Sequence, residues 1–182
     1  AIGAGKPLDP DVQILPVNGT REALFNAALV ATPPMKAATR PAILMPNPFY
    51  QCYAAAALAA GADPVYIAAT ADNGFMPDFV SLPDMLLART AMIYVCSPAN
   101  PQGSVASLAY LKDLLALARL HGILLAVDEC YADIYDRDKP AGALQAALEL
   151  DGTLDNLIVF HSLSKRSSLP GLRSGFCAGD KN

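Results

Sequence analysis

Three features of this 182-residue sequence could do chemistry: an amine, a carboxylate and a turn at the start of a helix. Lys165 could form a Schiff base with a carbonyl compound. Asp128 directly follows the apolar run 123–127, and its carboxylate needs a partner because an unpaired buried charge is costly. A protonated ring nitrogen would be such a partner. Residues 19–21, Gly-Thr-Arg at the start of a helical pattern, offer free backbone N–H groups that suit a phosphate.

Three other residues extend this set. Ser162 and Arg173 could add a hydroxyl and a guanidinium to the same anion. Tyr50 could supply a flat face for a ring. Taken one at a time, each residue has a simpler interpretation: Lys165 as a surface lysine, Asp128 as a turn residue, Arg173 as one half of a surface ion pair. The set as a whole favours a ligand site.

Short apolar runs alternate with longer helical patterns along the chain. This alternation predicts an α/β fold with three layers, α/β/α, around a mostly parallel sheet. Polar residues follow five of the predicted strands, and ligands of open α/β sheets bind beyond the carboxyl ends of strands. We therefore expect these five ends to meet at one rim. Strands are expected over 12–17, 42–45, 65–68, 91–96, 123–127, 157–160 and 175–178, and helices over 20–30, 50–60, 82–88 and 104–120.

The composition narrows the class of protein. The net charge is −4, so no basic field would attract nucleic acid. No stretch reaches the apolar length of a membrane span, and no membrane association is expected. The four cysteines lack a paired spacing, and with only two histidines they predict no metal site. We interpret Cys52, Cys96, Cys130 and Cys177 as reduced thiols, which favours a cytoplasmic protein.

Five segments in a fixed order carry a family resemblance. They are NGTREALF at 18–25, NPFYQCY at 47–53, SPANPQG at 97–103, VDECYADIY at 127–135 and HSLSKRSSLPGLRSG at 161–175. Together they resemble the motifs of class I/II aminotransferases. These are fold-type I enzymes of the aspartate aminotransferase superfamily, which depend on pyridoxal 5'-phosphate (PLP). The general likeness is to the branch that includes succinyldiaminopimelate aminotransferases.

The resemblance implies a role for each site residue. Lys165 would hold the aldehyde carbon of PLP, Asp128 would pair with the pyridine nitrogen, and Tyr131 and Asn100 would reach the phenolic oxygen. Tyr50 would stack on the ring. The implied catalytic residues are Lys165, Asp128 and Tyr131. The implied cofactor-binding residues are Gly19, Thr20, Arg21, Tyr50, Asn100, Asp128, Tyr131, Ser162, Lys165 and Arg173.

The resemblance also implies an activity and an assembly. The protein would move an amino group between an amino acid and a 2-oxo acid through a Schiff base on Lys165, and it would be a homodimer. Residues 1–182 would form the large PLP-binding domain of a longer enzyme, without its N-terminal segment and its small domain. In the family both Asn-Pro bonds are often cis, so Pro48 and Pro101 are expected to follow cis bonds.

Two other functions stay open on the same scaffold. A PLP-dependent C–S β-lyase or synthase would share these large-domain motifs. A non-catalytic ligand-sensing domain would need a DNA-binding segment outside this chain. The Ser-x-x-Lys run at 162–165 also fits the serine β-lactamases, but no Lys-Thr-Gly follows it and a strand precedes it.

Overall fold

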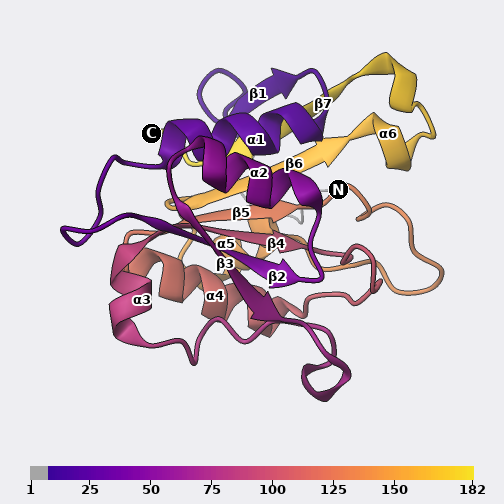
Figure 1. Cartoon of the computed structure of the whole chain (residues 1–182). Coiled ribbons are helices and arrows are strands. Elements are labelled where there is room, and N and C mark those ends of the chain that lie inside the picture. Colours follow the sequence, from indigo (N-terminus) through magenta and orange to yellow (C-terminus); the bar gives the residue numbers. More distant parts are fainter. Residues whose placement is uncertain (1–7) are drawn as a thin grey trace.

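A single seven-stranded sheet forms the middle layer of the protein (Figure 1). The computed structural model describes residues 8–182; residues 1–7 of the predicted domain lie outside that range. The strand order is β1-β7-β6-β5-β4-β2-β3. The strands are β1 (Ile14–Val17), β2 (Ala42–Asn47), β3 (Asp63–Ala68), β4 (Thr90–Cys96), β5 (Leu124–Asp128), β6 (Leu157–Ser162) and β7 (Gly175–Gly179).

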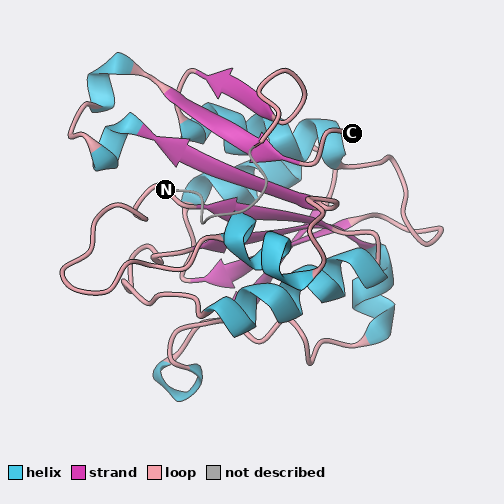
Figure 2. Ribbon diagram, turned by 180° about the vertical axis from the view of Figure 1, so that it is seen from behind, coloured by secondary structure: helices cyan, strands magenta, loops and turns pink. Residues whose placement is uncertain are grey.

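Helices cover both faces of this sheet (Figures 1 and 2). The first two helices lie on one face and the next three on the other, which confirms the three-layer prediction. The helices are α1 (Thr20–Ala31), α2 (Gln51–Ala59), α3 (Asp84–Arg89), α4 (Leu108–Leu120), α5 (Ala143–Leu150) and the short α6 (Leu163–Arg166).

Strand direction decides where the polar strand ends lie. β2, β3, β4, β5 and β6 are parallel, as predicted. β7 runs antiparallel to β6, and β1 runs antiparallel to β7. Two reversals restore the direction, so β1 points the same way as the parallel set. The carboxyl ends of β1, β2, β4, β5 and β6 therefore lie along one edge of the sheet, where ligands of such folds bind.

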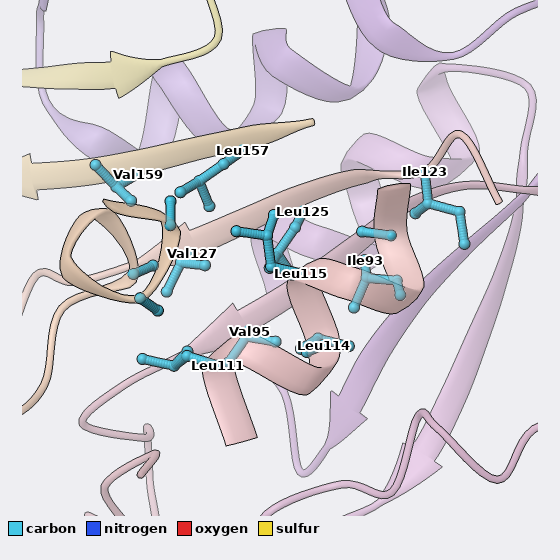
Figure 3. Packing of buried hydrophobic residues seen from close by; sticks show 14 of the residues in the cluster. Ile93, Val95, Leu111, Leu114, Leu115, Ile123, Leu125, Val127, Leu157 and Val159 are labelled. Atoms are coloured by element: carbon cyan, nitrogen blue, oxygen red, sulfur yellow. The ribbon is translucent and has the colours of Figure 1, made fainter. Parts of the chain in front are cut away.

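The alternation of side chains along the buried strands builds two cores. In β4, Ile93 and Val95 face one side of the sheet, and Met92 and Tyr94 face the other. Three leucines of α4, Leu111, Leu114 and Leu115, pack onto the Ile93 side, as Figure 3 shows. Burial of each such leucine stabilises the fold by about 1.5–3 kcal/mol. Because helices bury both faces of the sheet, the sequences of the central strands are continuous apolar runs.

Several predicted boundaries differ from those observed. The first strand begins at Ile14 rather than residue 12, and the helix expected from residue 104 begins at Leu108, where the Ser107 side chain caps the helix by accepting a hydrogen bond from Tyr110 N. β6 runs on to Ser162, and Lys165 then lies within α6 rather than directly at a strand end. The bonds before Pro48 and Pro101 are cis, as expected, and so is that before Pro98.

Candidate active site

A cavity of about 500 Å³ opens at the carboxyl edge of the sheet. Lys165 and Asp128 both line this cavity, although they come from different elements. All predicted site residues line it except Gly19, which directly precedes Thr20, and Ser162, which lies two residues before Ser164 on the wall. The predicted residues on its wall are Thr20, Arg21, Tyr50, Asn100, Asp128, Tyr131, Lys165 and Arg173.

One side of the cavity is a cradle for an anion, formed where β1 turns into α1. Gly19 has φ +96°, a conformation that L side chains rarely adopt, and α1 begins there with no side-chain cap. The first backbone N–H groups of α1 are therefore available, and they carry the positive end of the helix dipole. The guanidinium of Arg173 lies against Gly19, where an added Cβ would approach Nη2 to 2.4 Å. This arrangement suits a phosphate.

Asp128 lies at the end of β5 as a buried carboxylate with neutral donors only. Its Oδ2 accepts a hydrogen bond from the Tyr53 hydroxyl at 3.0 Å, and its Oδ1 accepts one from Cys130 N at 3.2 Å. Within residues 8–182 it forms no ion pair. Burial raises the pKa of Asp128. A cationic ligand group in the cavity would therefore be strongly favoured beside it.

Three tyrosines form the aromatic side of the site. The rings of Tyr50 and Tyr53 meet edge to face at 5.7 Å, and the Tyr53 ring stacks on Tyr94 at 4.4 Å. Tyr53 and Tyr94 are fully buried, so the pair is a rigid support for Tyr50 on the cavity wall. The Nε of Arg21 donates to the Tyr50 hydroxyl, which leaves the Arg21 side chain on the rim rather than in the anion cradle.

Lys165 is presented by the first turn after β6. Ser162 caps α6 by accepting a hydrogen bond from Ser164 N at 3.0 Å, so its hydroxyl holds the backbone rather than the cavity wall. The side-chain amine of Lys165 forms no hydrogen bond or ion pair with any of residues 8–182, so it is available for chemistry. Across the cavity, Asn100 Nδ2 lies 3.4 Å from the Tyr131 hydroxyl.

Six residues on the cavity wall were not predicted from the sequence as site residues, and four of them have ionisable side chains. Tyr53 follows Tyr50 by one helical turn, a spacing that could have suggested a shared face. Cys130 lies between Asp128 and Tyr131, and its Sγ is 2.9 Å from Thr20 Oγ1. Burial raises the pKa of this thiol, so it is a neutral wall group. The unpredicted residues with ionisable side chains are Glu22, Tyr53, Cys96 and Cys130.

The opposite face of the same strands carries a structural contact between a carboxylate and an imidazole. Glu129 is buried behind Asp128, accepts a hydrogen bond from Ala143 N at 2.7 Å and pairs with His161 Nε2 at 2.8 Å. It therefore ties the start of α5 to β6 and lines none of the site. In residues 8–182 no group of three or more His, Cys, Asp or Glu side chains could hold a metal ion. In the same range no helix is long and apolar enough to cross a bilayer.

The fold and the cavity define an α/β domain whose ligand site joins a free amine, a buried carboxylate and an anion cradle at one sheet edge. Such a set suits a phosphorylated, ring-containing carbonyl cofactor. A family model described as aminotransferase class I and II matches residues 2–182. The chain belongs to this family, as its motifs predicted.

Individual relatives agree with the family. An LL-diaminopimelate aminotransferase of Dehalococcoides mccartyi is 33% identical over 177 residues, which are 97% of this chain and 43% of that protein. The crystal structure of an aminotransferase from Neisseria meningitidis is 45% identical, with a TM-score of 0.90 over 97% of this chain and 44% of its own. A probable N-succinyldiaminopimelate aminotransferase from Thermus thermophilus is 29% identical, with a TM-score of 0.86 over 99% of this chain and 45% of its own. The chain spans less than half the length of these relatives.

Proposed function

We propose that the protein is a PLP-dependent aminotransferase that moves an amino group between an amino acid and a 2-oxo acid. The observation that carries the proposal is the shared cavity of Lys165 and Asp128, an available amine and a buried carboxylate without a cation. Class I and II aminotransferases generally depend on PLP. The matched relatives carry aminotransferase names, which favours transamination over β-elimination on the same scaffold.

The residues present fit PLP group by group. The N–H groups at the start of α1, together with the guanidinium of Arg173, would hold the phosphate. Asp128 would hold a proton on the pyridine nitrogen, which resolves the cost of its burial. Tyr50 would lie against the ring, and Asn100 and Tyr131 would hold the phenolic oxygen. When bound, PLP supplies a carbonyl for the amino group and a ring that withdraws electrons from the substrate.

Lys165 would have two tasks in this scheme. Its amine would first hold the aldehyde carbon of the cofactor. Once a substrate amine replaces it, the free Lys165 would take the proton from the substrate Cα, since its place on the cavity wall leaves it no competing protein partner. Tyr53, through its hydrogen bond to Asp128, would keep that carboxylate turned toward the cavity.

The names of the relatives suggest which substrates to test. One is an LL-diaminopimelate aminotransferase and another a probable N-succinyldiaminopimelate aminotransferase. We therefore propose amino acids with a second carboxylate at the far end of a long side chain as amino donors. The first pair to assay is LL-diaminopimelate and its N-succinyl derivative, each with 2-oxoglutarate as the acceptor.

We further propose that residues 1–182 are the large domain of a longer chain, and that this chain is a cytoplasmic homodimer. The share of each relative that the chain matches supports the first point. Val30 is 87% exposed and Leu58 59% exposed on the outer side of α1 and α2, which supports a subunit contact there. The four free cysteines support a reducing compartment.

Reduction with borohydride tests the proposed function. The whole protein should show a visible absorbance band, and borohydride should fix the label on a peptide that contains Lys165. Lys165→Ala should lose the band and the transaminase activity. Lys112→Ala is the matched control, because Lys112 lies on α4 and pairs with Glu149 away from the cavity. Near-normal turnover in Lys165→Ala, or a label on another lysine, would refute the assignment.

A further inference from the structure

The anion cradle already contains a carboxylate of the chain itself. Glu22 lies in the first turn of α1 and lines the cavity. Its Oε2 accepts a hydrogen bond from Arg173 Nη2 at 3.0 Å. An ideal Cβ on Gly19 would lie 2.4 Å from that nitrogen and 3.3 Å from the Glu22 oxygen. The guanidinium and the carboxylate are therefore both packed against the turn that would receive a phosphate.

Arg173 has limited capacity for a second anion. A guanidinium has five N–H donors, and here Nη1 donates to Pro170 O while Nη2 donates to Glu22. A phosphate bound at Gly19 must either take Nη2 from Glu22 or share Arg173 with it. In the first case an ion pair is lost, and in the second a carboxylate and a phosphate lie side by side. Both cost binding free energy.

From this geometry, and resting on the proposed function, we infer that Glu22 is a resident competitor of the cofactor's phosphate. It pairs with Arg173 and thereby weakens the binding of any phosphate monoester in the cradle. Its effect is confined to the phosphate end, because Glu22 contacts neither Asp128 nor Lys165. Glu22 thus sets how readily a phosphorylated cofactor leaves the site, and it takes no part in the reaction at the substrate.

The opposite role for the same contact makes an opposite prediction. If Glu22 served only to hold Arg173 in place for the phosphate, removal of its charge would weaken phosphate binding. Glu22 is half exposed, and α1 starts without any side-chain cap, so the helix does not depend on this carboxylate for its first hydrogen bond. Glu22→Gln keeps the shape of the side chain and removes only the charge.

Calorimetric titration of the cofactor-free whole protein with inorganic phosphate is the direct test. Glu22→Gln should tighten phosphate binding by about two- to fivefold, the range set by the free energy of a partly exposed ion pair. Glu22→Asp, which withdraws the carboxylate but keeps its charge, should give a smaller change. Glu149→Gln is the matched control, since Glu149 is similarly exposed and paired with Lys112. It should leave phosphate binding unchanged.

A second titration compares PLP with pyridoxal, which lacks the phosphate. Glu22→Gln should tighten PLP binding and leave pyridoxal binding unchanged. Unchanged or weaker phosphate binding in Glu22→Gln overturns the inference even where PLP still labels Lys165. Tighter phosphate binding without any PLP label on Lys165 supports the inference and refutes the proposed function. Absence of measurable phosphate binding in both the parent and Glu22→Gln overturns the cradle itself.

Discussion

Substitution of Gly19 by alanine should damage the anion cradle in two separable ways. The first is backbone strain, because Gly19 has φ +96° and ψ 155°, a region that is essentially limited to glycine. Such a residue costs about 1–3 kcal/mol of folding free energy when it carries a Cβ. The second is a collision, since the new Cβ would lie 2.4 Å from Arg173 Nη2 and 2.9 Å from its Cζ.

The collision sets the expected loss of affinity. Arg173 must move by about 1 Å to restore an ordinary contact distance of roughly 3.4–4 Å, and the shift takes its guanidinium out of line with the helix start. Loss of one charge-assisted hydrogen bond costs about 1.5–3 kcal/mol. Gly19→Ala should therefore weaken phosphate and PLP binding by about ten- to one-hundredfold.

Gly152→Ala separates the two effects. Gly152 also has a positive φ, +79°, but a Cβ there would meet nothing within 4 Å. Urea unfolding should show a loss of stability of about 1–2 kcal/mol in this control, while calorimetry shows normal phosphate affinity. Gly19→Ala should show both losses. If Gly19→Ala binds phosphate as tightly as the parent protein, Arg173 and the α1 turn do not form the anion site.

Two other changes address charge burial. Burial raises the pKa of Asp128 above its ordinary value of 3.8, so this carboxyl contributes stability below pH 3.8 that is lost as pH rises through the folded-state pKa. Asp128→Asn should therefore stabilise the cofactor-free protein at pH 7 by about 1 kcal/mol, as measured by urea unfolding. The gain over the parent protein should vanish near pH 3.8. The same gain at both pH values would contradict this reasoning. Lys36 Nζ donates to the carbonyls of Thr90, His121 and Gly122. Lys36→Met should lower the free energy of unfolding by about 2 kcal/mol, and a change below about 0.5 kcal/mol would show that these contacts are incidental.

Much of the fold followed from the pattern of apolar residues. The runs at 91–96 and 123–127 are uninterrupted because both faces of the central strands are buried, and the structure confirms them as β4 and β5. α5 was not predicted. Its eight residues include six Ala or Leu, and a short apolar stretch shows too few polar positions to reveal its period. The reversal of β7 was also not predicted, since the pattern of one strand carries no information about its direction.

The site was predictable to the extent that its residues belong to single motifs. Lys165 and Asp128 each follow a recognisable strand, and they meet because parallel strands end at one edge. Tyr53 was missed for a physical reason. It lies on the buried face of an alanine-rich helix, and only its hydroxyl contact with Asp128, seventy-five residues along the chain, distinguishes it from a core tyrosine.

The contacts that could not be predicted from the sequence are those that depend on the register between neighbouring strands. Cys96 of β4 is the Cα partner of Asp128 in β5. This register places the loop after β4 over the turn after β5. Asn100 meets Tyr131 for that reason, although nothing in either motif refers to the other. A shift by one residue would turn Asp128 to the α5 side, where Glu129 now lies. The two neighbouring carboxylates thus take opposite faces, one toward a ligand cavity and one toward a helix start, and it is the register of the sheet that assigns them.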